Sequence, residues 1–415
     1  MTNGRRAVIT GMGVTTSLGF SVSDFWDALL ACRSGIRRIT SFDPSEYRSQ
    51  IAGEITDFDA NAFLEPKLTV RLDRFAQLAL AATKEAVEMS GVDFSREVAQ
   101  RCGAIVGTGI GGLLEIETQH KRLLERGPRR VSPLMIPKLM ANAAAAQVSI
   151  LYGIKGPNAS TVTACASAAN AIADAADLIR RGEVDVMISG GAEAAITPLG
   201  LAGFCAQKAL STRNDEPERA SRPFDADRDG FIIGEGAGIV VLEELEHARR
   251  RDARIYAEFL GSGASADAYN IVAPDPSGTG AVIAMKNALD DAGLNPTDVD
   301  YVNAHGTSTV LGDEMEALAI RQLFGNHADK LPVSATKSMT GHLLGASAAV
   351  EAVATIMAVD KNVIHPTANY ETPDPKCNLD CVPGAPREAV VNAAISNSFG
   401  FGGHNVTLAF GKFTG

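Results

Sequence analysis

The chain has 415 residues, of which 46% are hydrophobic and 21% are charged, a balance typical of a globular protein rather than a disordered one. Its formal net charge of −11 argues against non-specific binding to nucleic acids. The longest apolar runs, such as 141–150, are too short to cross a bilayer, so we expect no membrane segment.

The predicted elements alternate between strands and helices along the chain. We expect a strand at 7–10, helices near 22–30 and at 74–89, a strand at 103–106, a helix at 168–181 and a strand at 184–188. Residues 1–6 lead directly into the first strand without a long apolar core or a cleavage site, so no signal peptide is expected. The alternation indicates an α/β fold with buried strands.

The first half of this pattern resembles the second. The helix at 168–181 and the strand after it are similar to a helix at 347–359 and a strand at 393–396, and the segment 103–112 is similar to 299–306. No linker-like tract divides the chain. We therefore predict a duplicated α/β unit in which loops of both halves line one site.

Six cysteines, at positions 32, 102, 165, 205, 377 and 381, form no C-x-x-C pair. This usage suits a reducing cytoplasm, which is the expected location. Cys377 and Cys381 are interpreted as incidental loop residues rather than as half of a metal site.

Cys165 lies in a stretch of small residues where the helix at 168–181 begins. The free N–H groups at a helix N-terminus favour an anion, so we expect a lowered thiol pKa and an oxyanion site for a carbonyl under attack. The alternative is a buried cysteine that acts only as a small hydrophobic side chain. Its local context leaves both interpretations open.

Three later segments place reactive residues after predicted strands: 301–309 with His305, 334–342 with Lys337 and His342, and 397–403 with Phe401 among glycines. A single histidine there is more simply a turn residue, and Lys337 is either a surface cation or a charge that orients a histidine or carboxylate. Together with Cys165, the two histidines indicate a thiol nucleophile beside two neutral donors or acceptors.

Residues 107–112 match the dinucleotide fingerprint G-x-G-x-x-G after a predicted strand. However, Glu115 and Glu117 bring negative charge toward the phosphate position, and no strand ending in an acidic residue follows about 20 residues later. Nucleotide binding is therefore not expected.

These segments together resemble the condensing enzymes of the thiolase superfamily, specifically the chain-elongating type II β-ketoacyl-[acyl-carrier-protein] synthases. The resemblance runs from 8–13, through 221–225 and 228–231, to 399–403. It implies a five-layered αβαβα architecture from two similar halves, 1–255 and 256–415, in one compact unit that is usually a homodimer. It implies no cofactor and no catalytic metal. Whether a monovalent ion binds near Asn303, Glu351 and Asn397 stays open.

The resemblance also implies roles for individual residues. Cys165 would accept the acyl group from acyl carrier protein, with the N–H groups of Cys165 and Phe401 as oxyanion hole and Phe401 as a gate. His305 and His342, supported by Lys337, would decarboxylate malonyl-carrier protein and stabilise the enolate. The remaining expected sites are Thr307 and Thr309 for the pantetheine arm, Ile110, Phe204 and a dimer mate's Ile136 for the acyl pocket, and Lys67, Arg71, Arg129, Arg130, Lys208 and Arg213 for docking of the acidic carrier.

One departure from the family pattern concerns Val272 and Ala273, where the family often has hydroxyl side chains. The expected activity is fatty-acid chain elongation. The alternatives are the same condensation in a polyketide or secondary-metabolite pathway, and a non-catalytic acyl-binding partner with the same fold.

Overall fold

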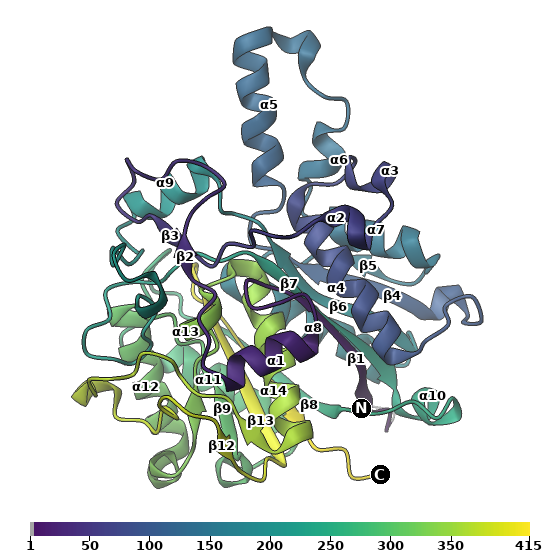
Figure 1. The fold of residues 1–415 in the computed structure, drawn as a ribbon. Coiled ribbons are helices and arrows are strands. Elements are labelled where there is room, and N and C mark those ends of the chain that lie inside the picture. The colour runs from purple at the N-terminus through teal and green to yellow at the C-terminus, as the bar shows by residue number, and fades with distance from the viewer. Residues whose placement is uncertain (1–3) are drawn as a thin grey trace.

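The computed structural model describes residues 4–415 and shows one ten-stranded sheet in the order β10-β9-β13-β14-β8-β1-β7-β6-β4-β5 (Figure 1). Its strands are β1 Ala7–Thr15, β4 Cys102–Gly107, β5 Asn158–Ala159, β6 Val186–Glu193, β7 Gly236–Glu244, β8 Ala257–Ala266, β9 Tyr301–Asn303, β10 Val333–Ser334, β13 Ala393–Gly400 and β14 His404–Gly411. Residues 1–3 of the segment in which no signal peptide is expected lie outside the described residues.

The strand order confirms the predicted duplication. Reading outward from the central antiparallel pair β1–β8, each half repeats the same sequence of pairings: antiparallel, antiparallel, then parallel. Thus β7 corresponds to β14, β6 to β13, β4 to β9 and β5 to β10. One set of five strands comes from 7–244 and the other from 257–411.

Helices form three further layers around the two halves of the sheet, which agrees with the expected αβαβα architecture. Helices α8 Ser167–Arg180 and α14 Ser347–Lys361 lie in the middle and share one hydrophobic cluster with strands of both halves. Helices α4 Arg74–Ser90 and α7 Ala143–Tyr152 cover the outer face of the first half. Helices α11 Thr279–Ala292 and α12 Val310–Phe324 cover that of the second. Every residue of α14 from Ser347 to Val359 is buried, including the polar Glu351, as expected for a helix enclosed between the two halves.

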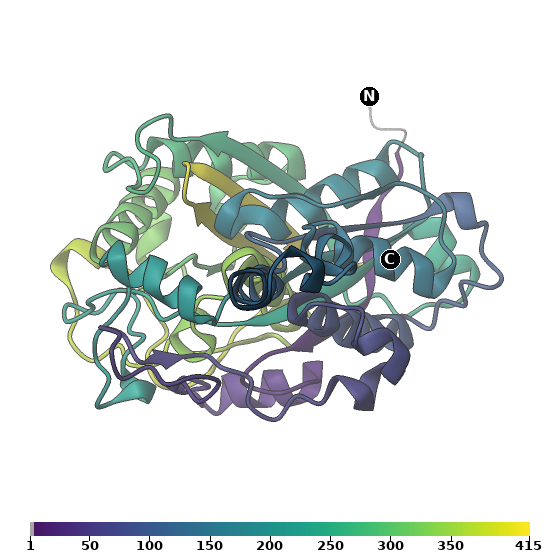
Figure 2. The same ribbon diagram turned by 90° about the horizontal axis from the view of Figure 1, so that it is seen from above.

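A helical arm, α5 Leu113–Arg126 with α6 Met135–Leu139, rises from this body (Figure 1) and points toward the viewer when the molecule is seen from above (Figure 2). The smaller elements are α1 Val22–Leu30, α2 Ala60–Phe63, α3 Pro66–Thr69, α9 Pro198–Ala206, α10 Leu245–Arg250, α13 Lys337–Thr340 and the strand pairs β2 Arg37–Arg38 with β3 Ile51–Ala52 and β11 Val363–Ile364 with β12 Arg387–Glu388. None of the helices within 4–415 has the length and apolar character that a bilayer crossing requires.

The predicted strand boundaries are wrong at two places, and in both the strand continues through glycines. The strand predicted at 7–10 continues to Thr15, and the strand predicted at 184–188 begins at Val186 and continues to Glu193. A Cβ on Gly13 would lie 2.0 Å from the Ala82 carbonyl oxygen of α4, and one on Gly190 would lie 2.1 Å from that of Gly238. These glycines let neighbouring backbones approach closely inside the layers.

Candidate active site

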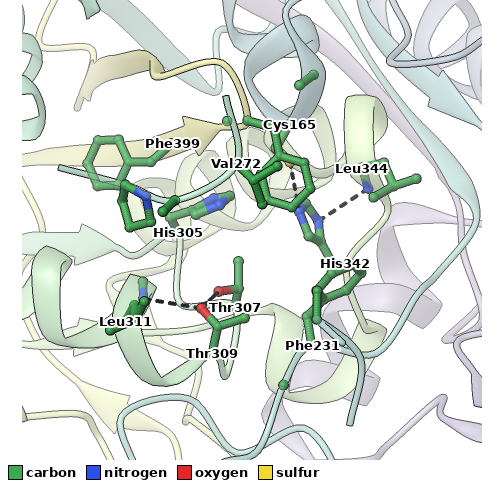
Figure 3. A pocket seen from close by; sticks show the side chains of 18 of the residues that line it. Cys165, Phe231, Val272, His305, Thr307, Thr309, Leu311, His342, Leu344 and Phe399 are labelled. Carbon is green, nitrogen blue, oxygen red and sulfur yellow. Dashed lines mark hydrogen bonds between the residues drawn. The ribbon is translucent and has the colours of Figure 1, made fainter. Parts of the chain in front are cut away.

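Loops of both halves surround a cavity of about 470 Å³ that contains the predicted reactive residues (Figure 3). The first half contributes Cys165, and the second contributes His305, His342 and Phe401. The sulfur of Cys165 and one nitrogen of each imidazole lie within 4.8 Å of one another. The predicted convergence of these distant segments is therefore confirmed.

Cys165 lies in a single 3-10 turn, η3 Ala164–Ala166, directly before α8. Ala164 has a positive φ of 51°, which marks a sharp bend before the helix. Burial raises the pKa of the Cys165 thiol to about 11, although the charge of Lys337 and the backbone N–H groups of Phe401 and of Cys165 itself oppose the rise. The expected lowering of this pKa is thus wrong: desolvation outweighs the helix terminus. These two N–H groups are the pair expected to form the oxyanion hole, and both lower the pKa of the thiol.

The proton of His342 is assigned by its hydrogen bonds. Nδ1 lies 2.8 Å from the Ser347 hydroxyl, which can donate or accept, and 3.2 Å from the backbone N–H of Leu344, which can only donate. Nδ1 therefore accepts, and the neutral ring carries its proton on Nε2. Nε2 lies 3.0 Å from the sulfur of Cys165 and donates to it (Figure 3). Burial, followed by the charge of Lys337, holds the pKa of His342 well below its usual value, which keeps the imidazole neutral.

His305 is held in the same protonation state by Lys337. The Lys337 ammonium lies 3.3 Å from Nδ1 of His305 and donates to the His305 carbonyl oxygen at 2.7 Å. Because an ammonium only donates, Nδ1 accepts and the proton of the neutral ring sits on Nε2. Burial and then the charges of Lys337 and His342 hold the pKa of His305 well below its usual value. Both imidazoles therefore carry an Nε2–H.

Lys337 is fully buried, so the alternative that it is a surface cation is wrong. Its position agrees with the other alternative, a charge that orients a histidine or carboxylate. It begins α13, and its ammonium pairs with Glu351 on α14 at 2.5 Å. Burial raises the pKa of Glu351 to about 7, and the Lys337 charge opposes the rise. The second oxygen of Glu351 and the amide oxygen of Asn303 are buried and have no hydrogen-bond partner among residues 4–415, and such oxygen atoms suit a hard cation.

Glu316, which the sequence did not single out, fixes the backbone around His305. Its two carboxylate oxygens accept the N–H groups of His305 and Gly306, each at 2.8 Å. The only sequence signal for this role is an acidic residue on the buried face of α12.

The cluster of Cys165, His305 and His342 does not fit a metal ion. A metal-bound imidazole nitrogen carries no proton, and the other ring nitrogen normally donates its N–H to an acceptor. Here Nδ1 of His305 faces the ammonium of Lys337, and Nδ1 of His342 faces the N–H of Leu344 and the hydroxyl of Ser347, which can donate as well. Both second nitrogens meet donors, so the nitrogens facing the cluster stay protonated.

The other predicted cavity residues lie as follows. Thr307, Thr309, Ile110, Phe204 and Lys208 all line the cavity, and the hydroxyl groups of Thr307 and Thr309 lie 2.9 Å apart. Val272 and Ala273 line it as well, and their N–H groups both donate to the Asn270 side chain. Ile136 lies on the arm at α6, is 58% exposed and does not line this chain's cavity.

Five of the six predicted docking residues are exposed: Lys67, Arg71, Arg129, Arg130 and Lys208. Arg213 differs, because it is half-buried and donates to the carbonyl oxygen of Asp227. Cys377 lies in a 3-10 turn and Cys381 in a loop, and both side chains are buried in the hydrophobic cluster beside α12.

The glycine loop 107–112 has its anion-binding groups occupied by the protein itself. The N–H groups of Gly109 and Ile110 donate to the carboxylate of Glu193, at 2.6 and 3.2 Å. A phosphate would have to displace a buried carboxylate, which agrees with the expectation that this loop binds no nucleotide.

Comparisons with known proteins agree with this geometry. Models described as the N-terminal and C-terminal domains of beta-ketoacyl synthase match residues 4–248 and 256–371. A 3-oxoacyl-[acyl-carrier-protein] synthase 2 of Synechocystis is 52% identical over 409 residues, 99% of this chain and 98% of the relative. The Coxiella burnetii enzyme of that name is 52% identical over 408 residues, 98% of this chain and 99% of the relative.

A solved structure extends the likeness to the fold. A ketosynthase in complex with its type II polyketide acyl-carrier protein superposes with a TM-score of 0.93 at 31% identity, covering 99% of this chain and 100% of that chain. The sequence match spans nearly the full length, and the fold matches with it. The chain belongs to the β-ketoacyl synthase family.

Proposed function

We propose that the protein is a 3-oxoacyl-[acyl-carrier-protein] synthase that elongates fatty acids by decarboxylating condensation. The observation that carries this is one cavity holding a buried thiol at a helix start and two buried, neutral imidazoles, each with its Nε2–H directed into the cluster. The name shared by relatives about half identical over the full length supports the fatty-acid assignment.

In the first step, Cys165 takes the acyl group from acyl carrier protein. Its sulfur attacks the thioester carbonyl, and the N–H groups of Cys165 and Phe401 stabilise the oxyanion. The bond to the pantetheine sulfur breaks, and the thiol proton ends on that sulfur. Because burial favours the protonated thiol, the thiolate is formed only as the carbonyl arrives.

In the second step, malonyl-carrier protein enters and its thioester oxygen accepts the Nε2–H groups of His305 and His342. Loss of CO₂ places negative charge on that oxygen, where two fixed, neutral and buried donors stabilise it. The enolate carbon attacks the acyl group on Cys165. The C–S bond breaks, 3-oxoacyl-carrier protein leaves, and the thiolate regains a proton from solvent.

The remaining assignments are proposals that follow from this reaction. Thr307 and Thr309 would contact the pantetheine arm, Phe401 would gate the cavity, and Ile110 and Phe204 would line the acyl pocket. A homodimer would bring the partner subunit's Ile136 to that pocket, and exposed apolar side chains of the arm and α7 (Leu124, Ile136, Met140, Ile150 and Leu151) support such an interface. We also propose a cytoplasmic location and units at 1–255 and 256–415.

The proposed function predicts a single acyl adduct. Incubation with acyl-carrier protein should add one acyl mass per chain, located on the Cys165 peptide, as measured by intact mass and peptide mapping. Cys165→Ala should remain unmodified, while Cys205→Ala, which removes a more exposed thiol, should load normally. An adduct that persists in Cys165→Ala would refute the nucleophile.

Carrier docking should depend on local positive charge, because the carrier is acidic and the chain carries −11 overall. Lys67→Glu with Arg71→Glu should raise the KM for acyl-carrier protein about tenfold, since attraction becomes repulsion. The rate of Cys165 alkylation by iodoacetamide should not change. Lys412→Glu, an exposed lysine near the C-terminus, serves as control. Equal losses in acyl transfer and alkylation would contradict docking at these residues.

A polyketide role is the second candidate, and the likeness to a polyketide ketosynthase at a TM-score of 0.93 favours it. The two candidates differ in the acyl group held on Cys165. Preference for saturated acyl chains over poly-β-keto chains in the loading assay would support the fatty-acid assignment.

A further inference from the structure

The duplicated fold contains a second copy of the nucleophile turn. The turn η3 Ala164–Ala166 leads into α8, and η7 Leu344–Ala346 leads into α14 in the same way. Ala164 and Leu344 have matching positive φ values of 51° and 50°. Gly345 therefore occupies the position that corresponds to Cys165.

In this second copy, the N–H that corresponds to the oxyanion donor of Cys165 binds a carboxylate of the chain. The N–H of Gly345 donates to Oε2 of Glu193 at 3.0 Å. Glu193 is the last residue of β6, as Gly400 beside the N–H of Cys165 is the last residue of the corresponding β13. A charged side chain is thus placed where the reacting half leaves room for substrate.

The carboxylate of Glu193 is completely buried and meets only donors. Oε2 also accepts the N–H of Gly109 at 2.6 Å, and Oε1 accepts the N–H of Ile110 at 3.2 Å and the hydroxyl of Thr108 at 2.9 Å. The Thr108 oxygen accepts from Gly111, so its own hydrogen is free to point at Glu193. Burial raises the pKa of Glu193, and these donors oppose the rise.

Two loops, one containing Gly109 and Ile110 and the other containing Gly345, both donate hydrogen bonds to this carboxylate. On one side is Ile110, a wall of the acyl cavity, and on the other is the segment in which Leu344 orients His342. A Cβ on Gly345 would lie 2.1 Å from the Gly109 nitrogen, so the two backbones are in direct contact. A shift of one loop is therefore transmitted to the other.

We propose that Glu193 is a positioning residue that ties the Ile110 wall of the acyl cavity to the His342 loop, and so couples chain-length selection to decarboxylation. This inference rests on the proposed function. Gln at position 193 has one acceptor oxygen in place of two and presents an NH₂ to a set of donors, which leaves a buried N–H without an acceptor.

The test compares the wild type with Glu193→Gln and with Glu183→Gln, an exposed control. Glu193→Gln should decarboxylate malonyl-carrier protein about tenfold to a hundredfold more slowly, because a small displacement of His342 is costly. It should also load a broader range of acyl lengths. The negative charge of Glu193 raises the pKa of Cys165, so in Glu193→Gln the pH midpoint of Cys165 alkylation by iodoacetamide should be lower. A fold that is merely loosened would not lower this midpoint.

If Glu193→Gln fails to fold, Thr108→Val is the test variant. This substitution is nearly isosteric and removes one hydrogen-bond donor to Glu193 on the Ile110 side. It should alter the acyl-length profile and, through the shared carboxylate, also slow decarboxylation, by less than Glu193→Gln does. Unchanged acyl-length and alkylation profiles in the variant that folds would overturn the proposal. The alkylation measurement needs no carrier substrate, so it tests Glu193 even if the wild type neither loads nor decarboxylates, which would refute the proposed function instead.

Discussion

Replacing His305 with alanine should slow decarboxylation of malonyl-carrier protein about a hundredfold to a thousandfold, the usual loss when one oxyanion donor is removed. The reason is geometric: Lys337 leaves the only proton of the neutral ring on Nε2, which points into the cavity. Acyl loading of Cys165 should be retained, because its oxyanion donors are backbone N–H groups. His342→Ala should lose decarboxylation equally and still load, more slowly because Nε2–H contacts the sulfur.

The assay is acetyl-carrier protein and CO₂ formed from malonyl-carrier protein, run beside loading by intact mass. His305→Gln supplies a neutral N–H donor without a basic ring nitrogen, so it should recover part of the decarboxylation. The exposed His120→Ala on α5 is the control. Full decarboxylation in both alanine variants would defeat the assigned roles, and full loss in His305→Gln would argue for a proton-transfer role instead.

Lys337→Met should destabilise the fold by about 3–5 kcal/mol at neutral pH, because it leaves the buried carboxylate of Glu351 without its charge partner. The effect depends on pH. Burial already raises the pKa of Glu351 to about 7, and without Lys337 the pKa rises further. A raised carboxyl pKa means that the folded state binds more protons, so stability falls as pH rises. The loss in urea midpoint should therefore be larger at pH 8 than at pH 5.5.

A double variant separates stability from chemistry. Lys337→Met with Glu351→Gln removes both charges and should recover most of the urea midpoint. It should still decarboxylate poorly, because Nδ1 of His305 has lost the donor that fixes its tautomer. Lys412→Met at an exposed position is the control. Recovery of both properties in the double variant would mean that Lys337 acts only by neutralising Glu351.

The fold was predictable because its periodic signals are strong. The helices at 74–89 and 347–359 and the duplication of helix and strand patterns are confirmed by α4, α14 and the matching halves of the sheet. Strand ends were not predictable where glycines serve close packing between layers, as at Gly13 and Gly190. A sequence shows a glycine, and it does not show which backbone lies against it.

The sequence predicted which residues form the site, but it did not predict their pKa values or all of their hydrogen-bond partners. Cys165, His305, Lys337 and His342 converge as expected. The direction of the Cys165 pKa was wrong because the helix terminus is a local feature, whereas desolvation depends on the whole assembled cavity. Glu193 and Glu316 were missed for the same reason: their partners are backbone N–H groups of loops distant in sequence.

The most direct test of the proposed condensation on Cys165 is a single-turnover chase. Acyl-enzyme loaded on Cys165 is freed of carrier protein and then mixed with ¹³C-labelled malonyl-carrier protein. We expect a 3-oxoacyl-carrier protein that contains the unlabelled acyl group and two labelled carbons, with one CO₂ released for each acyl group that leaves Cys165. Release of CO₂ while the acyl group stays on Cys165, or departs as free acid, would contradict it.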